Sequence, residues 1–349
     1  VEQGTDLHVE ARDLEVAVMS HLISGTGEVV LAMVPATDNL LKLGFDFKNL
    51  EVVHEGDSSP LLTGENLFLS VGGDGRIIPD PEKVNTSRVI GLEIDELVVP
   101  DLALFQRYLP PKWPLTLRGG EGILDGAAEL TPRSYFIDLS LKSDEAEVDI
   151  RQYRFETDLD AALKLNNPSI IDLASEVDGS YIRLQQAHLV RDGQRSEENW
   201  SAGIHLREGE FDLIGQEKKK AQEDVIDLFR ILGDTEARQL LAGSGGAFSF
   251  DADVSSLAWI GAFVGEAYKT RFQGSANIEG DLNLAAGLPE PGTDIAITSH
   301  ELAVDFLDYT AKGDGKIRLQ VSEGGENPDW KMNLDLAEAA MRRPVSYTH

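Results

Sequence analysis

The sequence predicts a mainly β protein: a large curved antiparallel sheet, forming a trough or partly open barrel, with a few short capping helices. Two observations lead to this fold class. Apolar and polar residues alternate along most of the chain, which is the two-residue period of strands that bury one face. Short turn-forming segments separate the alternating runs, and such turns join antiparallel neighbours, whereas parallel strands require long crossovers.

Half-buried strands are expected throughout the chain. The longest run, YRFETDLDAALKL, places Tyr153, Phe155, Leu159 and Leu163 on one face and charged residues on the other. At about 3.3 Å per residue, this strand would extend for roughly 40 Å. The other expected strands carry the following alternating apolar residues: Leu7, Val9 and Ala11; Leu41, Leu43, Phe45 and Phe47; Ile90, Leu92 and Ile94; Ile137, Leu139 and Leu141; Ile204 and Leu206; Ile295 and Ile297; Ile317, Leu319 and Val321; Trp330, Met332 and Leu334.

The stretch LTLRGGEGILDGAAELT, residues 115 to 131, is rich in glycine and raises the question of a phosphate-binding loop. Such a loop needs a helix directly after the glycines, because the free N–H groups of the helix N-terminus bind the phosphate. Instead, Leu124, Ala128 and Leu130 alternate with Asp125 and Glu129, as in a half-buried strand. We therefore predict that the glycines lie between two strands and let the chain reverse or bulge.

Three further segments are expected to join antiparallel strands. They are RDG at 191 to 193, KGDGK at 312 to 316, and SEGGENPD at 322 to 329.

Helical periodicity is confined to a few stretches. PDLALFQRYLPP begins with Asp101 as the expected N-cap and ends at Pro110. Further helices are expected in NPSIIDLASEV around 168 to 176, in EKKKAQEDVIDLFRILGDTEARQLLAG at 217 to 243, and in DVSSLAWIGAFVGEAYKTRF at 253 to 272. We expect these helices to cap or plug the ends of the sheet, although partner docking remains an alternative.

The composition excludes several classes of protein. The chain has 31 basic and 61 acidic residues, a net charge of −30, so it repels nucleic acid and anionic membrane surfaces. It contains no cysteine, which excludes disulfides, thiol nucleophiles and Cys-ligated zinc. The 42% of hydrophobic residues are sufficient to form a core or to line a cavity.

The organisation along the chain is expected to comprise three segments. Residues 1–166 form a β-rich groove segment, residues 167–215 a connecting β segment, and residues 216–349 an α+β segment with amphipathic helices and a terminal β meander. Neither a membrane helix nor a signal peptide is recognisable. Because strand patterns run almost from one end to the other, we expect the chain to be a piece of a longer protein, with any targeting segment outside it.

Known catalytic and metal-binding motifs are not found. The seven histidines include no H-E-x-x-H, and there is no G-x-S-x-G or P-loop motif. GDG at 313 to 315 and GGDGRIIPDPE at 72 to 82 lack the ligand spacing of a calcium loop. Lys218, Lys219 and Lys220 suit a solvated segment. We therefore expect no catalysis, no metal and no cofactor; a carbohydrate-active enzyme that uses paired acids remains a third alternative.

Two segments of the sequence resemble the AsmA-like superfamily of AsmA/TamB/YhdP-type periplasmic lipid-transfer proteins. They are LEIDELVVPDLALFQRYLPPKWPLTLRGGEGILDGAAEL at 92 to 130 and VDGSYIRLQQAHLVRDG at 177 to 193. The resemblance implies a long trough that is hydrophobic inside, held in the periplasm of Gram-negative bacteria by an inner-membrane anchor outside this chain, and a role in phospholipid transport or outer-membrane homeostasis. The helical patterns between 216 and 270 depart from a plain trough.

The expected functional site is the apolar face of the sheet. A wide sheet with few helices leaves apolar surface exposed, and such a surface is typical of a ligand or partner site. We predict that phospholipid or another acyl-chain ligand binds the inward residues of the longest strands: Ile137, Leu139, Leu141, Phe155, Leu159 and Leu163. The alternative is a structural or adhesive extracytoplasmic β protein whose core is closed by its own side chains.

Overall fold

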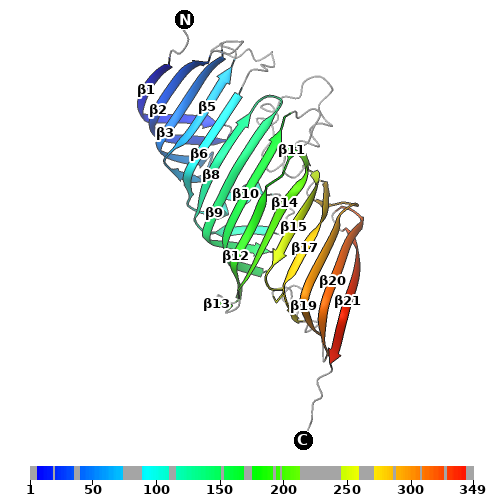
Figure 1. Ribbon diagram of the computed structural model, residues 1–349. Coiled ribbons are helices and arrows are strands. Elements are labelled where there is room, and N and C mark those ends of the chain that lie inside the picture. Colours follow the sequence, from blue (N-terminus) through cyan, green and yellow to red (C-terminus); the bar gives the residue numbers. More distant parts are fainter. Residues whose placement is uncertain are drawn as a thin grey trace.

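The fold class predicted from the sequence is confirmed: the protein is mainly β, and its strands form a large antiparallel sheet. The computed structural model describes residues 6–18, 20–34, 40–73, 89–109, 115–150, 153–168, 175–191, 194–196, 199–212, 245–258, 271–285, 288–306, 309–325 and 328–342. In Figure 1 the sheet is elongated, twisted and curved, with β1 at one end and β21 at the other.

The secondary structure consists of strands and one short 3-10 helix in the described ranges. The elements are β1 (Asp6–Val18), β2 (His21–Val34), β3 (Leu40–His54), β4 (Leu62–Gly64), β5 (Leu67–Gly73), β6 (Val89–Val99), η1 (Leu102–Tyr108), β7 (Leu115–Gly119), β8 (Gly122–Leu130), β9 (Tyr135–Ile150), β10 (Tyr153–Asn167), β11 (Ser175–Glu176), β12 (Tyr181–Arg191), β13 (Gln194–Arg195), β14 (Trp200–Asp212), β15 (Gly245–Val254), β16 (Arg271–Gln273), β17 (Ala276–Ala285), β18 (Leu288–Pro289), β19 (Asp294–Phe306), β20 (Tyr309–Glu323) and β21 (Asp329–Arg342).

The topology is a meander in which each long strand pairs with the next one along the chain. The order is β1, β2, β3, β5, β6, β8, β9, β10, β12, β14, β15, β17, β19, β20, β21. Several short strands continue a long one after an interruption. For example, β4 and β5 both pair with β3 and β6, and β7 and β8 both pair with β9.

The strands bend at β-bulges, where the alternation slips by one residue. In β6 the inward-facing apolar residues have even numbers up to Ile94 and odd numbers from Leu97 onward. The register with β8 shifts between these two residues. Glu96 has a left-handed φ of 52°, and its N–H donates to Oδ1 of Asp125 at 2.8 Å. A bulge bends its strand and increases the local twist, so each bulge adds curvature to the sheet.

The same bulge recurs farther along the sheet. Gln186 on β12 has a φ of 50° and Glu301 on β19 a φ of 56°, both at register shifts. The N–H of Gln186 donates to Oγ of Ser201 at 3.4 Å, and that of Glu301 donates to Oδ1 of Asp314 at 3.3 Å. Because a side chain of the next strand accepts each displaced N–H, the curvature is distributed over the sheet without leaving these donors unsatisfied.

The largest core lies between the N-terminal strands and η1, and we call β1 to β9 with η1 the closed region. Phe47, Leu97 and Leu102 are completely buried there, and Leu102 belongs to η1. The buried residues of this core are Leu14, Ile23, Phe47, Leu50, Val52, Leu61, Leu62, Leu67, Leu69, Ile94, Leu97, Val99, Leu102, Ala146 and Val148.

The helix predicted after residue 100 is confirmed as η1. Asp101 is its N-cap, and Oδ1 of Asp101 accepts the N–H of Ala103 at 2.9 Å. The long strand predicted from Tyr153 is also confirmed, as β10.

The glycine-rich stretch lies between two strands, as predicted. Gly120, with a φ of 111°, separates β7 from β8, and both strands pair with β9, so the chain bulges here and does not reverse. The predicted hairpin at 322 to 329 is confirmed by the pairing of β20 with β21, and β12 pairs with β13 around residues 192 and 193.

The turn predicted in KGDGK is wrong, because β20 runs through residues 312 to 316. Gly313 lies opposite Leu302, next to the bulge of β19, so this glycine serves a bulge and not a chain reversal. The helix predicted around 168 to 176 is wrong at its end, since Ser175 and Glu176 form β11; residues 169–174 lie outside the described ranges.

The helix predicted from residue 253 is wrong at its start, because Asp253 and Val254 belong to β15. Residues 259–270 of that prediction, and the whole of the predicted helix at 217 to 243, lie outside the described ranges. The sheet continues across residues 166 and 215, since β10 pairs with β12 and β14 pairs with β15.

Candidate functional site

The candidate site is one face of the sheet, on which cross-strand partners form a continuous apolar row. Directly opposed residues of an antiparallel pair project to the same face, so a row of partners can be followed from strand to strand. We call this row the inner row and the face that carries it the inner face. The inner row consists of Leu124, Leu141, Ala161, Ile182, Ile204, Ala252, Ile278, Ile297 and Ile317.

The neighbouring row, shifted by one residue, projects to the opposite face and is mostly polar. It consists of Ile123, Lys142, Asp160, Arg183, Gly203, Asp253, Asn277, Thr298 and Lys316. We call this the outer row. The contrast between the two rows extends over the same nine strands, so the sheet is amphipathic across most of its length.

The middle of the inner row is exposed. Ile182 on β12 and Ile204 on β14 are directly opposed, and each is 47% exposed. Leu163 on β10, which lies on the same face, is 46% exposed. A β-branched residue in a strand normally gains about 1.5 to 3 kcal/mol from full burial. Exposing three large apolar side chains on one face therefore marks this part of the sheet as a candidate binding surface.

The inner face of the closed region is buried in its middle and exposed along the edge strand β1, where Val9 is 49% exposed. There a second apolar row crosses eight strands, and Leu69 in that row is only 2% exposed. The members of this row are Val9, Val29, Phe45, Leu69, Leu92, Ala128, Ile137 and Leu165. The apolar face thus continues from β1 onward, but its burial changes along the sheet.

Five of the six lipid-binding residues predicted from the sequence lie half-buried or exposed on the inner face. Leu163 is exposed, and Ile137, Leu139, Leu141 and Leu159 are half-buried. On adjacent strands β9 and β10, Leu139 is opposite Leu163 and Ile137 is opposite Leu165. The structure therefore brings these five side chains together on one face of one strand pair.

The sixth residue, Phe155, lies on the same face of β10 but in a covered part of it. It is 1% exposed and contacts the edge of the Trp200 ring, with 5.4 Å between the ring centroids. Both residues belong to a small closed cluster with Ala187. Phe155 therefore contributes packing at this site.

Sequence reasoning missed Ile182 and Ile204 as site residues. The available signal was the alternation itself, which continues through YIRLQQAHLV and SAGIHL. Alternation indicates which residues share a face, but it does not distinguish a covered face from an open one. Their exposure depends on how segments distant in the sequence pack against the sheet, which has no local signature.

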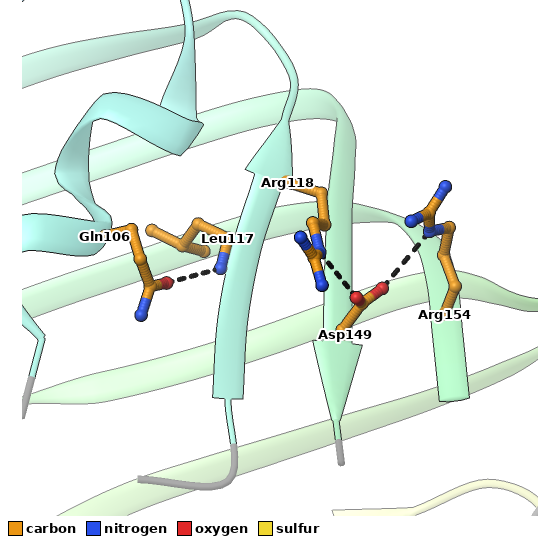
Figure 2. A network of polar contacts seen from close by, with 5 residues as sticks. All are labelled: Gln106, Leu117, Arg118, Asp149 and Arg154. Atoms are coloured by element: carbon orange, nitrogen blue, oxygen red, sulfur yellow. Dashed lines mark hydrogen bonds and ion pairs between the residues drawn. The ribbon is translucent and has the colours of Figure 1, made fainter. Parts of the chain in front are cut away.

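The outer face carries ion pairs between adjacent strands. Asp149 on β9 pairs with Arg118 on β7 and Arg154 on β10, with Nε to carboxylate distances of 2.5 and 3.2 Å (Figure 2). Toward the C-terminal end of the sheet, Arg318 on β20 donates to both carboxylate oxygens of Asp294 on β19. This interaction holds the pKa of Asp294 below its ordinary value. These pairs are solvent-exposed links between strands.

A cavity lies over the bulges of the first strands and not on the inner row. Its volume is about 570 Å³, and it is broad and open. It is lined mainly by polar residues, which are Arg12, Asp13, Glu15, Ser24, Thr26, Asn49, Glu51, Thr63 and Glu65, together with Leu14, Gly25, Leu50 and Gly64. Its chemistry differs from that expected for an acyl chain.

Potential catalytic and metal-binding groups are dispersed. Within the described residues, no three His, Asp or Glu side chains are close enough to hold a metal ion. His205 accepts the Nε–H of Arg183 at 3.0 Å on the outer face, and His300 is exposed. Over the same ranges, no helix has the length and hydropathy required to cross a membrane.

Comparisons with known proteins identify no relative: no family model, curated protein or solved structure matches the chain.

Proposed function

We propose that the protein is a non-catalytic lipid-binding or lipid-transfer module whose inner face holds acyl chains. The observation that carries this proposal is the exposure of Ile182, Ile204 and Leu163 in the middle of a continuous apolar face. Ligand contacts would involve these three residues and the half-buried Leu139, Leu141, Ile137 and Leu159 beside them.

The dimensions of the inner row suit a lipid tail. Neighbouring strands lie about 4.8 Å apart, so nine strands span about 38 Å across the sheet. The hydrocarbon core of a bilayer is about 30 Å thick and contains two leaflets, so one tail reaches about 15 Å. The row therefore provides more than the length of one tail, without a deep pocket that would retain it. A transfer surface needs sites of similar affinity, and a uniform apolar row supplies them.

The cellular setting is proposed from the resemblance to AsmA-like proteins described above. We place the protein in the periplasm, with an inner-membrane anchor outside this chain, and in phospholipid transport or outer-membrane homeostasis. The net charge of −30 fits such a role, because a negatively charged protein does not adsorb to anionic bilayers. Nucleic acid is not a proposed partner.

The test compares two matched double variants. Ile182→Asp with Ile204→Asp places two charges on the exposed part of the inner face. Ile123→Asp with Phe136→Asp places two charges on the outer face, where Ile123 and Phe136 are 46% and 44% exposed. Native mass spectrometry of protein purified from a bacterial host should detect bound phospholipid in the wild type and the outer-face control. The inner-face variant should remain folded and lose it.

Equal lipid in all three proteins, or lipid in none of them, would contradict the proposal. The second outcome would favour a structural or adhesive β protein with a self-closed core, which the buried core of the closed region supports as the alternative. An apolar dye separates these functions further, because only an open inner face increases the dye's fluorescence.

A further inference from the structure

The helix η1 is attached to two distant parts of the sheet. On one side, Leu117 of β7 donates its N–H to Oε1 of Gln106 at 2.7 Å, as Figure 2 shows. On the same side, the N–H of Leu102 donates to the carbonyl oxygen of Gly120 at 2.8 Å. These bonds join η1 to the interruption between β7 and β8.

On the other side, η1 is attached to the ends of β2 and β3. Nε2 of His21, the first residue of β2, lies 2.6 Å from the hydroxyl of Tyr108, and the two rings are stacked. Arg107 pairs with Asp57 after the end of β3, at 2.5 Å. The helix thus spans from β7 to β2 and β3, which lie several strands apart in the sheet.

Between these attachments, η1 covers one end of the closed region. Leu102 is completely buried in its core, and Leu104, Phe105 and Tyr108 pack against the same core. Leu7, which lies on the inner face of β1 toward the opposite end of these strands, is 56% exposed. Of the two ends, η1 therefore covers the His21 end.

The attachment to β2 and β3 contains two histidines. The rings of His21 and His54 meet edge to face, with 5.2 Å between their centroids, and Nδ1 of His54 lies 2.9 Å from the carbonyl oxygen of Glu55. Burial lowers the pKa of His21, and the nearby His54 and Arg107 lower it further. Burial also raises the pKa of the Tyr108 hydroxyl, so this group remains protonated.

The charges that face His21 come from each element packed against it. Arg107 of η1 is positive, the His54 ring of β3 meets His21 edge to face, and Tyr108 of η1 is neutral. Asp57 opposes them but already pairs with Arg107. Val18, directly opposite on β1, carries no charge, and the backbone N–H of Glu55 bonds to Ser20. A proton on His21 therefore adds a positive charge to a half-buried site that already holds the charge of Arg107.

We propose that η1 is a pH-sensitive strap that closes one end of the apolar trough at neutral pH and is released by protonation of His21, which lies against Tyr108. The gating role rests on the lipid-binding function proposed above; the release itself does not. Release would leave η1 attached through β7 alone and would uncover the core where Phe105 and Tyr108 pack against it.

The direction of the pH dependence follows from the lowered pKa. A histidine that binds its proton less readily in the closed state favours the closed state at neutral pH. This contribution is complete above the ordinary pKa of 6.5 and decreases as the pH falls below it. A one-unit difference in pKa between the closed and released states corresponds to about a tenfold change in the closing equilibrium.

Amide hydrogen exchange of the 102–109 segment at pH 7.5 and pH 5.5, corrected for intrinsic rates, tests the strap. The wild type should lose protection in this segment at pH 5.5. His21→Gln should remain protected at both pH values, because its amide oxygen accepts the Tyr108 hydroxyl and does not titrate. Tyr108→Phe should be unprotected at both. His300→Gln, at an exposed position on β19, should behave like the wild type.

Wild-type protection that does not change with pH, or an unchanged pH dependence in His21→Gln, would overturn the strap. Uptake of a neutral apolar dye, N-phenyl-1-naphthylamine, by the same proteins then tests the link to lipid binding. Uptake that increases at pH 5.5 in the wild type and not in His21→Gln supports gating. A pH-dependent strap in a protein that never takes up the dye would contradict the proposed function and the gating, and leave the release intact.

Discussion

Ile94 in the closed region and Ile204 on β14 have nearly the same local sequence setting, yet they differ in burial. Each is flanked by polar or small residues in an alternating strand, and each lies on the inner face. Ile94 is 8% exposed and Ile204 is 47% exposed. The difference comes from what lies above the sheet, since β1 to β9 curve around a common core with η1, whereas β12 and β14 do not share that core.

This comparison shows that one repeated pattern can serve two purposes. Where the apolar face meets itself and a helix, it stabilises the fold. Where the apolar face stays exposed, burial of that surface by a ligand would be favourable and would contribute to binding. The following predictions test whether the two regions differ as the burial indicates.

The largest expected effect is on stability in the closed region. Phe47→Ala removes a completely buried ring and should lower the free energy of unfolding by about 3 to 5 kcal/mol. Ile204→Ala removes a side chain that is half exposed and should cost about 1 kcal/mol or less. Urea unfolding followed by circular dichroism measures both. Similar losses of stability for the two variants would show that Ile204 is buried in solution and that the inner face around β12 and β14 is not exposed.

A smaller effect is expected at the bulges, which curve both parts of the sheet. Asp125→Ala removes the acceptor that lies 2.8 Å from the N–H of Glu96, and it should cost about 1 to 2 kcal/mol. Asp314→Ala removes the longer bond to Glu301, at 3.3 Å, and should cost less than about 1 kcal/mol. Amide exchange at Glu96 and Glu301 reports each bulge directly.

Glu129→Ala is the control for the first bulge, because Glu129 lies on β8 like Asp125 and is exposed. In Glu129→Ala, the amide hydrogen exchange at Glu96 should match that of the wild type. If Asp125→Ala leaves that exchange unchanged too, the carboxylate does not hold the bulge, and the curvature of the closed region has another origin.

Much of the sheet was predictable from the sequence because alternation depends only on local burial. Even the bulges leave a trace: apolar positions change parity between Ile94 and Leu97, with two polar residues between them. A strand that was read with unbroken parity would have placed Leu97 on the wrong face. The turn predicted around Gly313 is wrong because glycine is favoured both beside bulges and in turns, so its presence alone does not distinguish the two.

The candidate site was only partly predictable. Five of its residues were recognised on β9 and β10, but Phe155 was grouped with them because alternation places it on the same face. Its burial against Trp200 depends on β14, which is distant in the sequence. The two attachments of η1 were not predictable for the same reason, since His21 and Tyr108 are 87 residues apart.

The smallest expected effect is on the outer face, where the two regions should not differ. Asp294 pairs with Arg318, which lowers the pKa of Asp294 from its ordinary value of 3.8. A lowered carboxyl pKa stabilises the folded state above the unfolded pKa, and this contribution is lost as the pH falls through the folded pKa. Because the pair is exposed, Arg318→Ala should lower the melting temperature only slightly at pH 7.

The difference in melting temperature between wild type and Arg318→Ala should stay constant above about pH 5 and disappear as the pH falls below 3.8. Arg118→Ala in the closed region should have a similarly small effect at pH 7, because its pair with Asp149 is also on the outer face. A difference for Arg318→Ala that grows in acid would contradict the assigned direction of the pKa. A much larger loss of stability for Arg118→Ala than for Arg318→Ala would show that the outer face also contributes to the difference between the two regions. The inner face alone would then not explain that difference.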